Sequence, residues 1–315
     1  MDAPVVARVV RNGVVESVHH GLGVVTDAAG AVLVAVGDPG TVVLPRSANK
    51  PLQAVGCLRA GAPARDETLA VAASSHSGEP FHLDAVRRLL AAGGLTEAAL
   101  RNTPDYPVDE AARIAWIAAG RPRTPLAQNC SGKHAAMVTA AAASGWDVAA
   151  YLDPTHPLQR LLAATIEEFA GEPVAAVVVD GCGAPQHGLT LAGLARAFGR
   201  LASAPDGEAA RVADAMRRFP EYVGGTGRDA TGLMRAVPGL VAKDGAEGVF
   251  AVGLPDGRGV AVKIADGASR GRGVLLAGLL RRAGVGPDAA LATLADEVVL
   301  GHGRPVGRVE GVRLG

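Results

Sequence analysis

The stretch LPRSANKPLQAVG, residues 44–56, gives the strongest indication of the fold, because it places Ser47 three residues before Lys50. Pro51 suits the first turn of a helix, and positions i and i+3 share one face of a helix, so we expect the hydroxyl and the amine to touch. A neutral amine beside a serine is a general base for a nucleophile. The alternative for this spacing alone is a helix-capping serine followed by an exposed lysine.

Lysine is rare in this chain, and its few positions therefore stand out. Of the 31 basic residues only four are lysines, namely Lys50, Lys133, Lys243 and Lys263. An arginine keeps its proton inside a protein, whereas a lysine loses it when it is buried or lies near other cations. We therefore expect the lysines to mark places where an amine must be neutral. The alternative is chance survival with ordinary ion pairing.

Two further elements extend the serine–lysine pattern in chain order. Lys243 ends a strand-like segment before Asp-Gly, as in the K-[ST]-G element that accompanies S-x-x-K in β-lactamases and penicillin-binding proteins. The segment AASSHSGEP lies between them, and we predict that its Ser75 relays a proton between Lys50 and Lys243. Ser77 is expected to cap the helix that follows, which leaves Ser75 free.

A second cluster, in AQNCSGKHAAM and VVVDGCGAPQHG, carries possible metal ligands. Cys130 and Lys133 lie at i and i+3, and Cys182 follows an apolar run. Two thiolates, together with a nitrogen from Lys133, His134 or His187, can form a zinc site. A lysine ligand requires that the metal force deprotonation of its amine. The alternative is that these cysteines are small buried hydrophobes.

Composition excludes several classes of protein. The formal net charge is zero at pH 7, which gives no electrostatic footprint for nucleic acid or an anionic membrane. The first residues alternate like a strand and not like a signal peptide, and no apolar run approaches a membrane-spanning length. Three cysteines argue against a secreted disulfide framework, and Cys57 is expected to be a buried hydrophobe. We predict a cytoplasmic protein.

Strand-like segments lie at both ends of the sequence, with helical patterns between them. Closely spaced apolar segments open the chain and predict antiparallel hairpins. Helical patterns follow at 79–94, 109–120 and 157–171, a buried strand is predicted at 174–180, strands return between 239 and 267, and a last edge strand is predicted at 305–314. We predict one α/β domain, 1–315, with a mainly antiparallel sheet from both termini covered by helices. Its helical middle part, about 80–170, can form a subdomain.

Two other segments have weaker indications of function. GGTGRDATG, residues 224–232, lacks the Gly-Lys-Ser/Thr ending of a phosphate-binding loop, so we predict a turn into a helix, with Arg228 facing the site. Lys263 lies on a predicted strand with Asp266 nearby. A structural ion pair is as well supported there as a catalytic role.

Taken together, the motifs RSANKP, SSHSGE, NCSGKH, DGCGAP, GTGRDATGLM, AKDGAEGV and KIADG resemble those of the bacterial asparaginases of the Rhizobium etli type, or class 3. The resemblance covers essentially the whole chain. It implies a serine β-lactamase and penicillin-binding-protein-like fold, hydrolysis of L-asparagine to L-aspartate and ammonia, a bound Zn²⁺ ion and a homodimer. Its Ser-Lys chemistry implies an acyl-enzyme in which Lys50 takes the proton of Ser47.

The resemblance also assigns roles to individual residues. It implies the catalytic residues Ser47, Lys50, Ser75 and Lys243, the zinc ligands Cys130, Lys133 and Cys182, and the substrate-binding residues His134 and Asp180; Arg46, which precedes Ser47, and Arg228 are further substrate-binding candidates. Gly183, Thr226 and the segment 229–232 depart from the motifs, which leaves open the preference for asparagine over glutamine. A glutaminase, a β-lactamase or peptidase on the same fold, and a non-catalytic zinc-stabilised scaffold are the alternatives.

Overall fold

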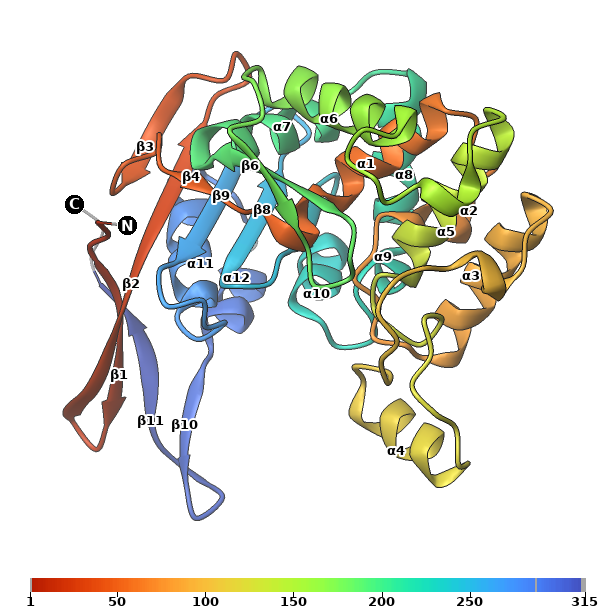
Figure 1. The fold of residues 1–315 in the computed structure, drawn as a ribbon. Helices are drawn as coiled ribbons and strands as arrows, with labels where there is room; N and C mark the ends of the chain where they lie inside the picture. The colour runs from red at the N-terminus through yellow and green to blue at the C-terminus, as the bar shows by residue number, and fades with distance from the viewer. Residues whose placement is uncertain (1, 287, 313–315) are drawn as a thin grey trace.

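The main sheet of the protein is built from both ends of the chain, coloured red and blue in Figure 1. In this computed structural model, which describes residues 2–286 and 288–312, the strand order is β10-β11-β1-β2-β9-β8-β7, and β3 also pairs with β2. The pairings between the described strands of this sheet are antiparallel. The strands are β1 (Val5–Arg11), β2 (Val14–Thr26), β3 (Val32–Val36), β7 (Val241–Asp244), β8 (Val249–Gly253), β9 (Gly259–Ile264), β10 (Val298–Gly301) and β11 (Arg304–Gly311). The predicted α/β fold with a sheet from both termini is confirmed.

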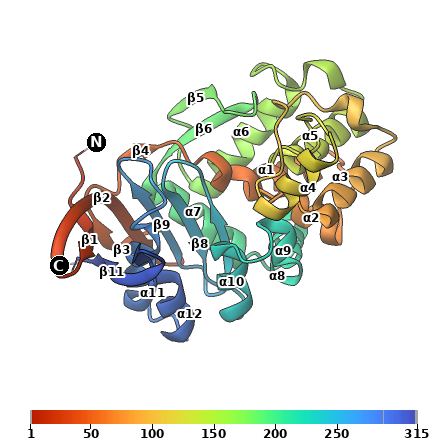
Figure 2. The same cartoon turned by 90° about the horizontal axis from the view of Figure 1, so that it is seen from below.

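Helices cover both faces of this sheet, as the view in Figure 2 shows. The helices of the described residues are α1 (Lys50–Arg59), α2 (Asp66–Ala72), α3 (Pro80–Ala92), α4 (Glu110–Ala118), α5 (Ser131–Ala143), α6 (Pro157–Ala170), α7 (Leu191–Ala202), α8 (Gly207–Arg218), α9 (Pro220–Val223), α10 (Asp229–Ala236), α11 (Arg272–Arg282) and α12 (Asp288–Ala295). Of these, α7 and α11 make the main contacts with the sheet. Gly23 in β2 faces Leu279 of α11, whereas Gly259 in β9 faces Ala195 of α7. Because Gly259 pairs with Thr26, three residues from Gly23, the two glycines point to opposite faces.

Burial differs between the two ends of the main sheet. The strands β7, β8 and β9 are buried along their whole length, because helices pack on both sides, and they are mostly apolar apart from Lys243, Asp244 and Lys263. The first half of β2 is mostly exposed, and with β1, β10 and β11 it forms the ribbon that projects from the body in Figure 1. Asn12 and Gly13 form the turn between β1 and β2. Their φ angles of 46° and 82° are both positive, as a turn of type I′ requires.

A second, three-stranded sheet corrects one prediction. It has the order β4-β6-β5, formed by β4 (Val42–Val43), β5 (Ala176–Val179) and β6 (Pro185–Thr190). The strand predicted as buried at 174–180 is β5, and its four residues are exposed. An apolar run predicts a strand but not what covers it, and among the described residues β5 pairs with β6 alone.

The prediction of an edge strand at 305–314 is also wrong. The corresponding strand β11 lies between β10 and β1, so it is an inner strand. The edge is β10, which sequence patterns did not predict. Residues 313 and 314 of the predicted strand lie outside the described part of the chain.

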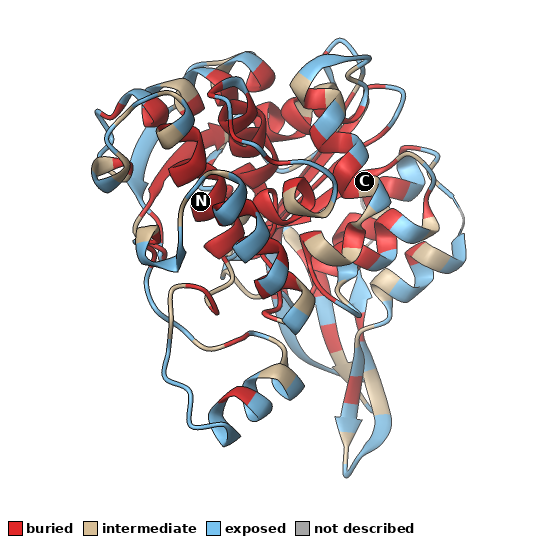
Figure 3. Ribbon diagram, turned by 90° about the vertical axis from the view of Figure 1, so that its right-hand side faces the viewer, coloured by how far each residue is buried: buried red, intermediate tan, exposed pale blue. Residues whose placement is uncertain are grey.

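The middle of the chain is helical, as predicted. Asp109 caps α4 by accepting a hydrogen bond from Ala112 N at 2.8 Å, and α6 ends at Gly171, which has a φ of 67°. In Figure 3, α4 stands apart from the body and is largely exposed. One hydrophobic core joins side chains of the helices and of the sheet. Within the described residues, none of the helices has both the length and the apolar character needed to cross a membrane.

A short 3₁₀ helix, η1 (Arg46–Asn49), leads directly into α1 and places the residues of S-x-x-K. Lys50 is the first residue of α1 and Pro51 follows it, as the sequence predicts. The loop after β7 approaches η1 closely at Gly245, where a Cβ atom would collide with the Pro45 carbonyl oxygen. The glycine of the Lys-Asp-Gly element therefore allows β7 and η1 to meet.

Gly259→Ala should destabilise the fold, because its methyl group would overlap the Ala195 carbonyl of α7. We expect a loss of about 3 kcal/mol in the free energy of unfolding, measured by urea denaturation. Gly232→Ala is the matched control, since nothing lies within 4 Å of a Cβ there and alanine favours a helix interior by about 0.5–1 kcal/mol. Equal stability of the two variants would contradict the packing of α7 on the sheet.

Candidate functional site

The amine of Lys50 lies at the centre of the site. Lys50 is buried, and its Nζ donates hydrogen bonds to Ser75 Oγ at 3.0 Å and to Cys130 Sγ at 3.2 Å. Ser75 follows α2 and is held by its backbone N–H, which donates to the Val223 carbonyl at 3.0 Å. The Lys50 amine therefore joins Ser75 to the cysteine cluster, two parts of the site that were predicted separately.

Ser47 precedes Lys50 but does not hold its amine. The Lys50 backbone N–H donates to the Ser47 carbonyl, but among the described residues no hydrogen bond joins the Ser47 hydroxyl to the Lys50 amine, because the Lys50 side chain reaches inward to Ser75. Arg46, next to Ser47, has a φ of 52°. A non-glycine residue in this left-handed region costs about 1–2 kcal/mol, and such strain clusters at functional sites.

Lys243 is fully buried on β7 and contacts its neighbour Asp244. Its Nζ donates to Asp244 Oδ1 at 2.6 Å and to the Asp244 carbonyl at 2.7 Å. Burial lowers the pKa of Lys243 to about 8, and the nearby Lys50 charge acts in the same direction. Ser75 was predicted to bridge the two lysines; it contacts Lys50, whereas Lys243 pairs with Asp244.

Both serines reach one open cavity of about 510 Å³. Its lining includes charged side chains from three separate segments: Arg228, Asp229, Asp244, Glu247 and Arg272. Asn129, which precedes Cys130, lines the same cavity. A substrate in this cavity can reach Ser47, Ser75 and several charges at once.

The predicted metal ligands also meet in space. Lys133 Nζ donates to Cys182 Sγ at 3.1 Å, and Cys130 and Cys182 pack together as buried residues. The pKa of the Cys130 thiol is lowered well below its usual value, because Cys182 donates a hydrogen bond to it and two lysine charges lie nearby. In the described part of the chain no three His, Cys, Asp or Glu side chains gather as a metal site, so this donor set needs its lysine.

The candidate substrate-binding residues lie around the same cluster. Arg46 Nε donates to Asp180 Oδ1 at 2.7 Å, and Asp180 Oδ2 lies 4.0 Å from Lys133 Nζ. His134 is buried, and its Nδ1 lies 2.6 Å from the Tyr151 hydroxyl. Its Nε2 is buried without a partner among the described residues. Burial lowers the pKa of His134 well below its usual value, so its ring is neutral.

Two smaller expectations are wrong, and one is confirmed. Lys263 donates to the carbonyls of Glu247 and Ile264, while Asp266 pairs with His19 at 2.8 Å. Ser77 donates to the Gly224 carbonyl at 3.0 Å and does not cap α3. The turn at 224–228 does lead into α10, as predicted, with Arg228 as the residue before the helix.

Cys57 is a buried core residue, as predicted, but sequence patterns missed Asp244, Asp229 and Arg272 as members of the site. Cys57 is buried in the core, and burial raises the pKa of its thiol to about 12. Asp244 occupies the variable position of the K-x-G element, and this place beside Lys243 is the sequence feature that could have identified it. Asp229 and Arg272 come from segments that are distant in sequence and meet only in the fold.

Three comparisons place the chain among known proteins. A family model described as L-asparaginase II matches residues 7–311, and the comparison with curated proteins gave no match. Among solved structures the chain is similar to a β-lactamase from Mycobacterium bovis, with 17% identity, coverage of 83% of this chain and 94% of that one, and a TM-score of 0.44. It is also similar to EstCE1, a hydrolase with promiscuous acyltransferase activity, with 11% identity, coverage of 81% and 92%, and a TM-score of 0.44.

Proposed function

Because the chain belongs to the L-asparaginase II family, whose members hydrolyse amides, we propose that it converts L-asparagine to L-aspartate and ammonia, and that it is of the Rhizobium etli type. The observation that supports this best is the 3.0 Å contact between the buried Lys50 amine and Ser75, beside a cavity that Ser47 also lines. A buried amine in contact with a hydroxyl is the arrangement that serine–lysine hydrolases use to accept a proton.

In the first step, Ser47 is the nucleophile. Its oxygen attacks the side-chain carbonyl carbon of asparagine, and its proton passes to neutral Lys50, which Ser75 and Cys130 hold in place. The Ser47 N–H has no backbone partner among the described residues, so it is free to donate to the oxyanion. The Gly245 N–H donates to the Val249 carbonyl at 2.9 Å and is therefore occupied. Loss of one oxyanion donor typically costs about a hundredfold in rate or more.

In the second step, the carbon–nitrogen bond breaks and ammonia leaves. The proton that Lys50 took from Ser47 passes through Ser75, which contacts Lys50, to the leaving nitrogen, and the buried Lys243, whose pKa is lowered to about 8, assists this transfer. A water molecule then attacks the acyl ester and returns a proton to Ser47. L-Aspartate is released, and each amine regains its starting protonation state.

Zinc is part of this proposal because the donor set fits it. Two sulfurs and the Lys133 nitrogen converge in a buried cluster. The pKa of Cys130 is lowered, as a thiolate ligand requires, whereas the pKa values of Cys182 and Lys133 are raised, so an ion would have to displace their protons. Cys130, Cys182 and Lys133 would hold the ion. When bound, it would supply a Lewis acid that orients or polarises the substrate. We also propose a homodimer in the cytoplasm, as the resemblance to this type of asparaginase implies.

The direct test is ammonia release from L-asparagine and L-glutamine, measured side by side with and without added zinc. We expect higher kcat/KM with L-asparagine. Nitrocefin serves as the comparison substrate for a β-lactamase on the same fold. Nitrocefin turnover comparable with ammonia release, or no ammonia from either amino acid, would contradict an asparaginase.

Lys50→Arg should keep the fold and remove most of the activity. Arginine retains the charge but cannot accept a proton, and loss of a general base costs about 10²- to 10⁴-fold. Ammonia release measures the activity, and circular dichroism with thermal unfolding checks the fold. Near wild-type activity in a folded variant would exclude Lys50 as the base.

Cys130→Ser should reduce zinc retention, because it removes one of the two sulfur ligands. Elemental analysis of protein purified after zinc loading gives the metal content. Cys57→Ser is the matched control, since Cys57 lies in the hydrophobic core and not in the cysteine cluster. Equal zinc content in Cys130→Ser and wild type would show that the site lies elsewhere.

A further inference from the structure

Two ion pairs line the cavity that holds the serines. Arg228 Nη2 lies 2.5 Å from Asp244 Oδ2, and Arg272 Nη2 lies 3.1 Å from Asp229 Oδ2. All four residues line the cavity together with Ser47 and Ser75. This wall therefore carries two positive and two negative side chains, whose charges cancel.

Each pair joins one buried and one accessible side chain. Asp244 and Arg272 are each 11% exposed, whereas Arg228 is 33% and Asp229 is 53% exposed. Burying a charge is costly unless a partner compensates it. Asp244 therefore holds Arg228 in position, and Arg272 holds Asp229. The two accessible side chains face the cavity.

The accessible pair has unused hydrogen-bonding capacity. Among the described residues, Arg228 donates one hydrogen bond, to Asp244, although a guanidinium has five N–H donors in a planar fork. Asp229 accepts through Oδ2, from Arg272, which leaves Oδ1 without a partner in the described part of the chain. A carboxylate can accept two parallel hydrogen bonds from the Arg228 guanidinium, and an ammonium can donate to Oδ1 of Asp229.

A structural explanation does not account for the whole arrangement. An aspartate in the first turn of a helix is ordinary, because it complements the helix dipole, and Asp229 begins α10. Arg272, however, begins α11, where a cation opposes the dipole. The helix dipole of α11 therefore disfavours Arg272, which is held instead by its contacts with Asp229, the Val249 carbonyl and the Phe250 ring.

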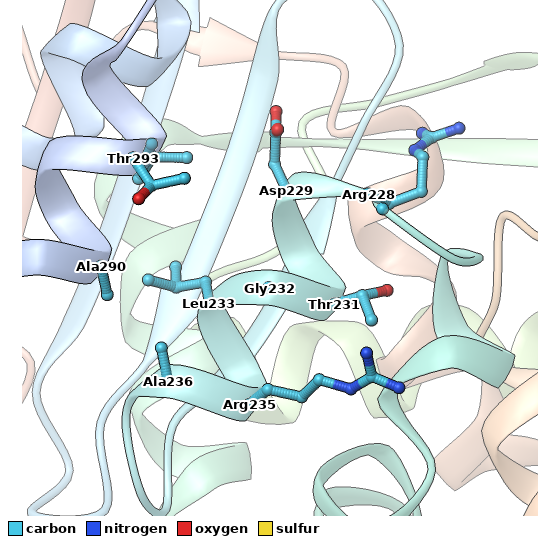
Figure 4. A pocket seen from close by; sticks show the side chains of 11 residues that line it. Arg228, Asp229, Thr231, Gly232, Leu233, Arg235, Ala236, Ala290 and Thr293 are labelled. Atoms are coloured by element: carbon cyan, nitrogen blue, oxygen red, sulfur yellow. The ribbon is translucent and has the colours of Figure 1, made fainter.

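The two accessible side chains also point the same way. Figure 4 shows the head groups of Arg228 and Asp229 directed away from Leu233 and Ala236. All four residues line a second cavity between α10 and α12, so Arg228 and Asp229 border both this cavity and the one that holds the serines. Consecutive residues before and at the start of α10 thus present a cation and an anion side by side. The α-carboxylate and α-ammonium of a free amino acid form the complementary pair, since both lie on one carbon atom.

We propose that Arg228 and Asp229 bind the α-carboxylate and the α-ammonium of the substrate, so that the enzyme selects free amino acid amides over N-acylated or peptide-bound ones. This subsite rests on the proposed amide hydrolysis, which it deepens. Asp244 and Arg272 are its positioning residues. The thiol groups of the zinc-ligand cluster do not line this cavity, so the subsite is separate from them.

The test compares three substrates: L-asparagine, N-acetyl-L-asparagine and L-asparagine α-N-methylamide. Each can release ammonia from the same side chain, but the second lacks the ammonium and the third lacks the carboxylate. We expect wild type to prefer L-asparagine over both by about 10- to 100-fold in kcat/KM, the size expected for hydrogen bonds to charged groups.

Two variants separate the roles. Arg228→Gln should lose the preference over the N-methylamide and keep that over the N-acetyl compound, and Asp229→Asn should do the opposite. Arg235→Gln is the matched control on the same helix, because Arg235 pairs with Glu221 at 3.2 Å and does not line the serine cavity. It should keep both preferences.

Equal hydrolysis of the three substrates by wild type would overturn the subsite while leaving the amidohydrolase intact. Equal loss of activity by both variants on all three substrates would also overturn the subsite. If wild type releases no ammonia at all, the proposed function fails first. Calorimetric binding of L-asparagine then tests the subsite by itself, since Arg228→Gln and Asp229→Asn should weaken binding by about tenfold or more; unchanged affinity in both variants would overturn it.

Discussion

The buried amine of Lys50 connects the parts of the site to one another. It hydrogen-bonds to Ser75 on one side and to Cys130 on the other, so the Ser75 hydroxyl and the sulfur cluster meet at a single nitrogen. An arginine there would place a permanent charge and a wider planar group in the same space. The scarcity of lysine in this chain agrees with that constraint, because three of its four lysines lie in or beside this site and all four are buried.

The sequence predicted the parts of the fold that depend on local pattern. The hairpins near the N-terminus, the helices that end in glycine and the return of strands after residue 239 follow from periodicity and turn residues. Exposure of β5 and the inner position of β11 do not, because an apolar run shows that a strand is favoured but not which neighbours it has. Those neighbours come from segments far away in the chain.

The same division applies to the site. S-x-x-K and Cys-x-x-Lys are short motifs, and their residues do come together with Ser75 and Cys182. The ion pairs of the cavity wall join residues 16 and 43 positions apart, and no pattern in either segment indicates its partner. The contact of Lys50 with Ser75 in place of Ser47 likewise depends on the turn from η1 into α1, which spacing on an ideal helix does not describe.

The open edge of β5 has a consequence for handling the protein in the laboratory. Its residues, Ala-Val-Val-Val, are exposed, and among the described residues one side of the strand has no partner. Natural sheet edges usually carry lysine, proline or a bulge that discourages pairing with another molecule. The strand β5 contains neither lysine nor proline. Concentrated or partly unfolded samples therefore have a ready place for intermolecular β-pairing, and aggregation is expected to start there.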